Sequence, residues 1–266
     1  MGNDARIGTC HLCGAHGPLT FEHIPPRAAF NDARVLEADI QKLMAADRLL
    51  GADDAGGRYK QQGAGNYTLC AACNSETGSW YAGEYVRAVK ALYGLSRAVP
   101  PFASGYFALE IRPLRFLKQV VAMFASACGS GFTSKHPDVV RFVKNKDSRE
   151  LPDHLSFYIA LFSIAGSTAF RQSGITSAAS LDTGRIDTMS EIAFPPFVLV
   201  MSFSGRTPDP RLFEITWFKN YGYTDASLIF FKMASLPVSS WLPVDYRTGA
   251  QLEADIAANI AEARQT

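Results

Sequence analysis

Apolar residues recur at helical spacing in two stretches of the first hundred residues. The first predicted helix covers residues 31–50, with Asn31 or Asp32 as its N-cap. The second begins at about Asn74 and ends at Gly94. Residues 51–65 between them are rich in Gly, Ala and Asp and lack an apolar period, which predicts a loop.

The pattern changes after residues 97–105, where two consecutive prolines mark a predicted domain boundary. Beyond it, helical and strand-like stretches follow one another. The expected strands are 107–112, 155–165, 197–204, 213–218 and 227–233, and the expected helices are 114–128, 137–144 and one from Thr248, which opens a T-G-A-Q capping box. We therefore expect an α+β protein, with one domain over residues 1–96 and a mixed α+β domain over residues 106–266.

Composition narrows the class of protein. With 47% hydrophobic and 19% charged residues, the chain is typical of a soluble globular protein. Its net charge of +1 gives no overall attraction to nucleic acid, so any such contact must come from a local patch. The N-terminus lacks a signal-peptide pattern and the longest apolar stretches are too short to span a bilayer, so we expect a cytoplasmic protein without membrane contact. The sequence contains no Walker loop and no GxGxxG, so its motifs predict no nucleotide cofactor.

Four of the five cysteines form two CxxC pairs, C-H-L-C at 10–13 and C-A-A-C at 70–73. Cytosolic thiols stay reduced, so clustered cysteines there favour metal over disulfides. Cys10, Cys13, Cys70 and Cys73 are thus predicted to hold one structural zinc with a closed shell of thiolates. The alternatives are four unrelated buried or redox cysteines, or a ligand role for His11 or His16. Cys128 lies in an apolar helical pattern and is predicted to be a core residue.

Between the two pairs runs L-T-F-E-H-I-P-P-R, residues 19–27. Its alternation predicts a short strand that projects Glu22 and His23 and is ended by the prolines. We expect residues 17–26 to form a β-hairpin packed against the helix that begins at about Asn74. The side chains of Glu22, His23 and Asn74 should then converge on one accessible cleft.

Together these motifs resemble the zinc-bearing branch of the HNH, or ββα-metal, endonuclease family. The chain has CHLC, EHIPP, NYTLC and CAACN in the family's order, over residues 7–94. The resemblance implies a zinc-stapled nuclease domain that hydrolyses DNA phosphodiester bonds, with RNA also open as a substrate. Residues 106–266 resemble no family that we recognise.

The resemblance also implies a role for each matching residue. Glu22 and Asn74 take the positions that bind a catalytic Mg²⁺ or Mn²⁺, and oxygen ligands suit these hard cations. His23 takes the position of the general base, and Asn66 that of the loop residue that braces the site. The family more often has Asp at the first position and His at the helix position.

Other residues have expected roles of lower specificity. Arg27, Arg58 and Lys60 are candidate phosphate contacts, or else solvated surface cations. The aromatics Trp80, Tyr81 and Tyr85 are expected in the core at their helical spacing. His136 and His154 stand alone in the sequence and are expected to have no role in catalysis.

Three functional hypotheses remain open. The first is an HNH-type nuclease whose second domain recognises substrate, forms a homodimer or responds to a regulatory protein. By analogy, such fusions are common in bacterial anti-phage defence and mobile elements. The second is a non-enzymatic zinc module that binds nucleic acid or protein. The third gives residues 106–266 an activity of their own, with the zinc domain as a targeting device.

Overall fold

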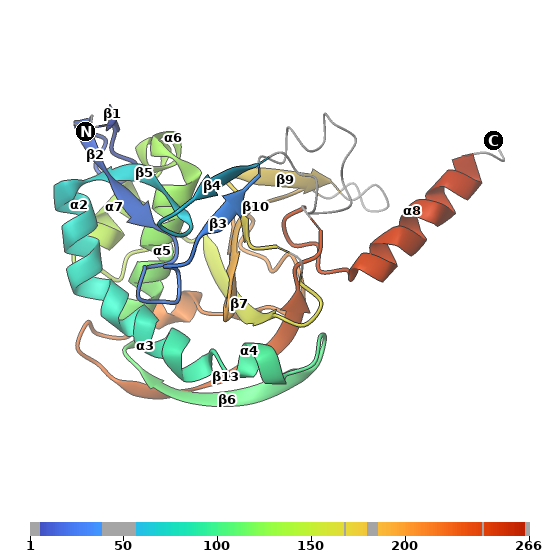
Figure 1. Ribbon diagram of the computed structural model, residues 1–266. Coiled ribbons are helices and arrows are strands. Elements are labelled where there is room, and N and C mark those ends of the chain that lie inside the picture. Colours follow the sequence, from blue (N-terminus) through green and yellow to red (C-terminus); the bar gives the residue numbers. More distant parts are fainter. Residues whose placement is uncertain (1–5, 39–56, 168, 180–185, 241, 264–266) are drawn as a thin grey trace.

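The computed structural model describes residues 6–38, 57–167, 169–179, 186–240 and 242–263. The N-terminal part is built on an antiparallel sheet in the order β1-β2-β5, with β1 at Arg6–Thr9, β2 at His16–His23 and β5 at Gly65–Cys70 (Figure 1). The predicted strand therefore exists, but the prediction of a hairpin within residues 17–26 was wrong. The hairpin partner of β2 is the earlier β1, in which Arg6 pairs with Leu19 and Thr9 with His16.

The helical stretch after the second CxxC pair was predicted, but its ends differ. It comprises α2 (Ala71–Thr77), a π-helical turn η2 (Gly78–Ala82), α3 (Gly83–Leu92) and α4 (Leu95–Ala98). Gly94 was predicted to end the helix, but its φ of −60° is right-handed and it leads directly into α4. The aromatic side chains of this stretch face the core as predicted, because Tyr81 and Tyr85 are buried and Trp80 packs against them.

The predicted helix over residues 31–50 is wrong where the structure describes it. Strand β3 (Val35–Glu37) lies inside that range and pairs with β4 (Arg58–Lys60), which lies inside the predicted loop. The Asn31 side chain does not cap a helix, because its Nδ2 donates to the carbonyls of Pro25 and Ala64, both at 2.7 Å. Residues 39–56, which hold the rest of both predictions, lie outside the described residues.

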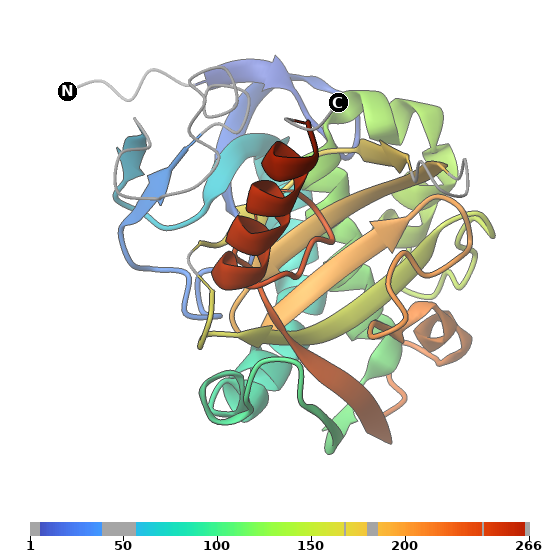
Figure 2. The same ribbon diagram turned by 90° about the vertical axis from the view of Figure 1, so that its right-hand side faces the viewer.

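The second half of the chain forms a large, mostly antiparallel sheet. Its order is β6-β13-β7-β11-β10-β8, with β9 beside β10 and β12 beside β7 (Figure 2). The bounds are Ser104–Ile111 for β6, Ser156–Ser163 for β7, Arg171–Gln172 for β8, Thr176–Ala179 for β9, Ile186–Phe194 for β10, Phe197–Ser202 for β11, Phe213–Glu214 for β12 and Ser227–Pro237 for β13. The mixture of helices and sheets confirms the α+β class.

The predicted strands are present in this sheet with one correction. The stretch 213–218 is only in part a strand, since β12 is followed by a 3-10 helix, η3, at Thr216–Asn220. The sequence did not predict β8, β9 and β10. Strand β7 pairs on both sides and every one of its residues is buried, which explains its unbroken apolar sequence.

Helix α5 (Pro113–Cys128) lies between the two halves of the chain, followed by α6 (Ser130–Lys135) and α7 (Pro137–Lys144). Nearly all of α5 is buried, and one continuous core joins residues on both sides of the predicted boundary, such as Leu69, Tyr81, Phe124 and Phe157. The last helix, α8 (Gly249–Ala263), extends away from this core (Figure 1). Its predicted capping box is present, with Thr248 N–H donating to Gln251 Oε1 at 2.8 Å.

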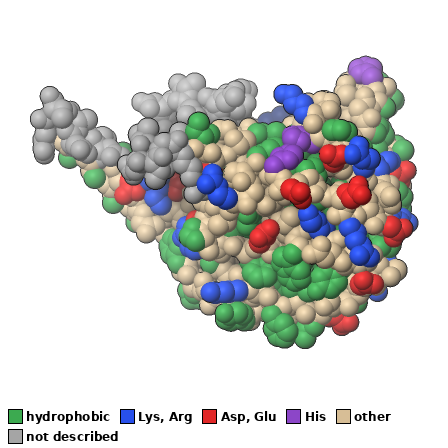
Figure 3. All heavy atoms as spheres, turned by 180° about the vertical axis from the view of Figure 1, so that it is seen from behind, with side chains coloured by type: hydrophobic (Ala, Val, Ile, Leu, Met, Phe, Trp, Pro, Cys, Tyr) green, Lys and Arg blue, Asp and Glu red, His purple; other side chains and the backbone are tan. Residues whose placement is uncertain are grey.

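Strands β6 and β13 form a ribbon at the bottom of the molecule with an exposed apolar outer face. Tyr106, Leu228 and Phe230 are all more than half exposed there, and hydrophobic side chains gather on this lower part of the rear view (Figure 3). Within the described parts of the chain, no helix combines the length and the apolar character needed to cross a lipid bilayer.

Candidate functional site

The four predicted zinc ligands lie together at one end of the β2–β5 pair. The Sγ atoms of Cys10, Cys13, Cys70 and Cys73 all lie within 4.8 Å of one another, and those of Cys13 and Cys70 are 3.9 Å apart. A tetrahedral shell with Zn–S bonds of roughly 2.3 Å brings sulfurs to about this spacing. The cysteines are therefore positioned to bind a metal ion, and the set is compatible with structural zinc.

Local backbone geometry holds the first of these knuckles. Cys10 N–H donates to the Ala15 carbonyl at 2.9 Å, and Gly14 N–H donates to the Cys10 carbonyl at 3.0 Å. Gly14 has a φ of +75°, which suits glycine at the turn. The Cys70 N–H donates to Cys10 Sγ at 3.3 Å and so links the two knuckles directly.

The electrostatic surroundings favour thiolate at Cys10. Burial acts to raise its pKa, but backbone N–H groups of Cys13, Cys70 and Leu12 outweigh burial and lower the pKa to about 7. At Cys73, burial and the neighbouring Cys10 raise the pKa of the thiol. The Nζ of Lys144, from α7, lies 3.8 Å from Cys73 Sγ and also pairs with Glu76, so the second half of the chain brings a positive charge to the site.

The residues considered as alternative ligands lie elsewhere. No histidine belongs to the metal-ligand cluster found among the described residues. The Nδ1 of His11 is 2.7 Å from the Ser126 carbonyl on α5, while His16 opens β2 opposite Thr9. Cys128 lies on α5, where its Sγ donates to Ser190 Oγ at 3.4 Å.

Glu22 and His23 lie at the other end of β2 and point to opposite faces, because neighbouring residues of a strand alternate. Glu22 stands opposite Asn66 on β5, so these two side chains share one face. On the other face the His23 ring packs edge-on against Phe21, with centroids 4.9 Å apart. The strand therefore separates the two residues of the motif, and the prediction that Glu22, His23 and Asn74 converge on one accessible cleft was wrong for His23.

The His23 ring is held by a backbone carbonyl that the sequence did not indicate. His23 Nε2 lies 2.8 Å from the carbonyl oxygen of Gln62. Since a carbonyl only accepts, Nε2 carries the hydrogen and the lone pair of the neutral ring is on Nδ1. Burial and the nearby charge of Arg27 lower the pKa of His23, although the Gln62 contact acts in the opposite direction. The ring is thus neutral at neutral pH, as a general base must be.

The Glu22 carboxyl is buried, with 7% of the residue exposed. Burial raises its pKa to about 8, and none of the described side chains pairs with it. A carboxyl in this setting is protonated at neutral pH unless a cation arrives to compensate the charge. Burial of a carboxyl group without a partner costs free energy, and a purely structural role gives no reason for that cost.

Asn74 lies on α2 beside the same strand. Its Nδ2 donates to Thr20 Oγ1 at 2.9 Å and to the Phe21 carbonyl at 3.2 Å, which orients the amide against β2. The amide nitrogen is thereby occupied, and Oδ1 is left as an acceptor. Thr20 and Glu22 share a face by alternation, so Asn74 lies on the Glu22 side of the strand.

The candidate phosphate contacts differ in whether their side chains are already hydrogen-bonded within the protein or exposed to solvent. Lys60 is engaged, since its Nζ donates to Glu37 at 2.5 Å, to the Gly65 carbonyl at 2.6 Å and to Asn66 Oδ1 at 2.7 Å. Asn66 itself lies within β5 and not in a loop. Arg27 is exposed and close enough to His23 to influence its pKa, and Arg58 is exposed on β4. Of the three candidates, Arg27 is therefore the one whose charge acts on His23.

The structure also brings together His136 and His154, which stand far apart in the sequence. Their ring centroids are 5.2 Å apart. Burial and the charges of His154 and Lys135 lower the pKa of His136. No spacing in the sequence could have indicated this pair, because the contact joins the start of α7 to the loop before β7.

No family model, curated protein or solved structure matches this chain.

Proposed function

We propose that the protein is a metal-dependent endonuclease of the HNH type that hydrolyses DNA. The observation that carries the proposal is the orientation of His23. Its Nε2 is held by the Gln62 carbonyl at 2.8 Å, which leaves Nδ1 as the basic nitrogen of a half-exposed ring. His23 lies on β2, and β2 pairs with β5, the strand that ends at Cys70 of the second cysteine pair.

The catalytic role of His23 follows from its tautomer. Nδ1 would take a proton from the attacking water while the Gln62 carbonyl holds the ring in place. Glu22 Oε and Asn74 Oδ1 would hold a hard divalent cation on the other face of β2, and such an ion would steady the charge on the phosphate and leaving oxygen. To meet both the cation and Nδ1, the phosphate would have to lie at the end of β2, which is His23. The Glu22 carboxyl, with which none of the described side chains pairs, and the fixed Asn74 amide fit such an ion. Arg27 would contact the phosphate backbone near His23.

Cleavage of plasmid DNA with Mg²⁺ or Mn²⁺ tests this proposal. The His23→Ala variant should lose about 10²–10⁴ in rate, as loss of a positioned base does. It should keep its zinc content and thermal stability. Its matched control is His154→Ala, which should cleave like the wild type. Cleavage by His23→Ala at the wild-type rate, or undiminished cleavage without a divalent cation, would show the proposal to be wrong.

A second candidate is a non-enzymatic zinc module for nucleic acid or protein. The hydrogen bonds from Asn74 to Thr20 and Phe21 favour it, since they give Asn74 a structural task. Metal content separates the two functions. The nuclease needs a hard cation beyond the zinc, and Glu22→Gln should weaken its binding, whereas the binding module needs zinc alone.

A further inference from the structure

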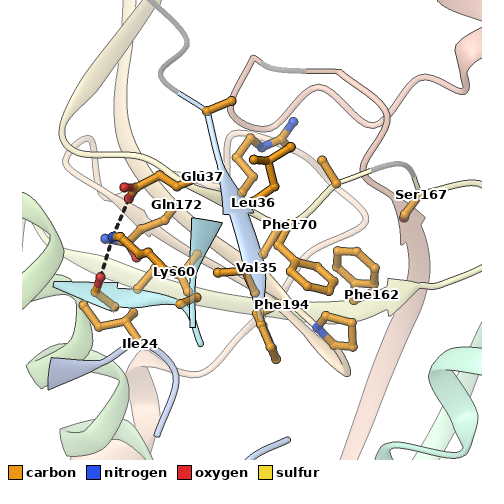
Figure 4. Close-up of a pocket in the computed structure, with 18 of the residues that line it drawn as sticks. Ile24, Val35, Leu36, Glu37, Lys60, Phe162, Ser167, Phe170, Gln172 and Phe194 are labelled. Atoms are coloured by element: carbon orange, nitrogen blue, oxygen red, sulfur yellow. Dashed lines mark hydrogen bonds and ion pairs between the residues drawn. The ribbon is translucent and has the colours of Figure 1, made fainter. Parts of the chain in front are cut away.

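A cavity of about 630 Å³ lies between the β3–β4 hairpin and the large sheet. This is within the size range of small-molecule sites, roughly 300–1,000 Å³. Its two walls differ in chemistry (Figure 4). One is aromatic and comes from the large sheet and its connections, while the other comes from β3, β4 and the start of β5 and combines the apolar Val35 and Leu36 with the polar Glu37, Lys60 and Asn66.

The aromatic wall offers a surface for a flat ring. Phe170 is 49% exposed although its ring stands 4.5 Å from that of Phe194. Phe162 lies behind it, with its centroid 6.1 Å from that of Phe170. The two supporting rings are themselves buried and fix the place of the exposed one. Phe170 therefore presents ring surface toward the cavity on a rigid base.

The polar groups of the second wall can form hydrogen bonds with the edge of a heterocycle. Lys60 Nζ donates its three hydrogen bonds to Glu37, Gly65 and Asn66, so Lys60 positions these groups and does not bind a ligand itself. The second oxygen of Glu37 remains an acceptor, and the Asn66 amide nitrogen remains a donor. Carboxylates and amides are the side chains that pair with exocyclic amino groups and ring nitrogens of bases.

A cation completes the lining. Arg34 is exposed at the cavity, with its guanidinium 4.2 Å from the centre of the Tyr59 ring. This stacking orients the fork of the guanidinium without neutralising its charge. Arginine in such a position contacts phosphate.

We propose that this cavity binds a nucleobase that carries an exocyclic amino group. The base stacks on Phe170, its amino edge pairs with Glu37 and Asn66, and its phosphate meets Arg34. The base belongs either to a free nucleotide or to an unstacked nucleotide of a nucleic acid. The second source rests on the proposed function, and the first does not. In the register of β2 and β5, Glu22 stands opposite Asn66 and His23 opposite Gly65. Asn66 and Gly65 line the cavity, so the cavity lies next to the candidate site.

Binding is measured on the full chain with zinc and without Mg²⁺ or Mn²⁺, so that no cleavage occurs. Equilibrium dialysis uses labelled AMP, GMP, CMP and UMP, and fluorescence anisotropy uses short single-stranded DNA. We expect the aminated nucleotides to bind at least tenfold more tightly than UMP, as loss of paired edge contacts predicts. Binding of mononucleotides identifies a free nucleotide as the source. Binding of DNA alone identifies the substrate.

Variants connect the binding to the two walls. Phe170→Ala should weaken binding about tenfold or more, because stacking on an aromatic ring dominates such sites. Phe170→Trp should keep it. Glu37→Gln should reduce the preference over UMP more than the affinity itself. Phe230→Ala, which removes another exposed ring on the outer face of β13, away from the cavity, should leave binding unchanged.

Failure of all four mononucleotides and of DNA to bind would overturn the proposal, as would equal binding by Phe170→Ala in a folded, zinc-loaded protein. Equal affinity for UMP would overturn the assignment of an amino edge. These results are independent of catalysis. The two proposals can fail separately. His23→Ala tests cleavage and should leave nucleotide binding intact, whereas Phe170→Ala tests binding in the cavity.

Discussion

The two ends of the β2–β5 pair carry very different sites. At one end, four thiol sulfurs lie within 4.8 Å of one another. At the other, Glu22 and His23 are neighbours in sequence but face opposite sides of β2, and Asn74 reaches the strand through the Phe21 carbonyl. The first site is built from the local turn at Cys10–Cys13 and the start of α2 at Cys70–Cys73, which the β2–β5 pairing brings together. The second depends on the register of two strands and on the placement of a helix.

The contrast shows which kind of motif can be interpreted from sequence. A CxxC pair bends its own backbone, as the Gly14 turn illustrates, so its two sulfurs approach each other wherever the pair lies. An acidic residue beside a histidine on a strand has the reverse property. Alternation separates the two side chains, and what each one meets is decided by other elements, here Gln62 for His23 and burial for Glu22.

Loss of the metal should have the largest effect. Cys70→Ser should lower zinc content below one ion per chain and unfold the N-terminal sheet, because structural zinc contributes about 10–16 kcal/mol of binding free energy in small domains. Elemental analysis and calorimetry measure both effects. Cys128→Ser, which alters a cysteine on α5, is the control and should keep the zinc. A native protein without zinc would contradict this prediction.

Glu22→Gln tests whether burial of the Glu22 carboxyl makes the stability of the protein depend on pH. The folded-state pKa of about 8 lies above the ordinary value of 4.5. The folded carboxyl therefore holds its proton more tightly, and its contribution to stability is present below pH 4.5 and lost as the pH rises through about 8. The slope is at most about 1.4 kcal/mol per pH unit.

Glu22→Gln should flatten this slope and be at least as stable as the wild type at pH 8. Urea unfolding from pH 5 to 8, without added divalent cation, measures it. Glu253→Gln on the exposed side of α8 is the matched control and should leave the slope unchanged. An equal slope in Glu22→Gln and the wild type would mean that Glu22 has a partner.

Asn74→Ala should have a smaller effect on stability, of about 1–3 kcal/mol, because it leaves the Thr20 hydroxyl and the Phe21 carbonyl without their donor. If Asn74 also binds the catalytic cation, part of the lost cleavage should return at raised Mn²⁺. Urea unfolding and a Mn²⁺ titration of cleavage separate the two roles. A stability loss with no change in cleavage at any Mn²⁺ concentration would favour the structural zinc module.

The smallest effect is expected at His136 and His154, which lie outside both sites. The folded pKa of His136 is lowered, so its contribution to stability is present above pH 6.5 and lost as the pH falls below that value. His154→Ala should raise the pKa of His136 toward the ordinary value, as NMR titration of the ring would show. Zinc content and cleavage should not change. A loss of cleavage in His154→Ala would break the contrast between the two ends of β2.

Much of the secondary structure could be predicted because local pattern and local chemistry agree. The unbroken apolar run of β7, the periodic α5 and the Thr248 capping box each form where the sequence indicates. The prediction failed at residues 31–38, where helical spacing competed with strand pairing. In the structure β3 pairs with β4, and the Asn31 side chain binds the Pro25 carbonyl and the carbonyl of Ala64, 33 residues away, instead of capping a helix.

The sequence by itself determined the thiolate set, the strand that carries Glu22 and His23, and the helix that follows Cys70. Each CxxC pair, the strand and the helix depend mainly on interactions within a few residues, whereas the pairing of β2 with β5 brings the two pairs of cysteines together. The tertiary structure decided the burial of Glu22, the carbonyl that fixes the tautomer of His23, the engagement of Lys60 and the cavity above Phe170. Each of these is a contact between distant segments, and its energy comes from desolvation and cross-strand geometry that only the packed chain creates.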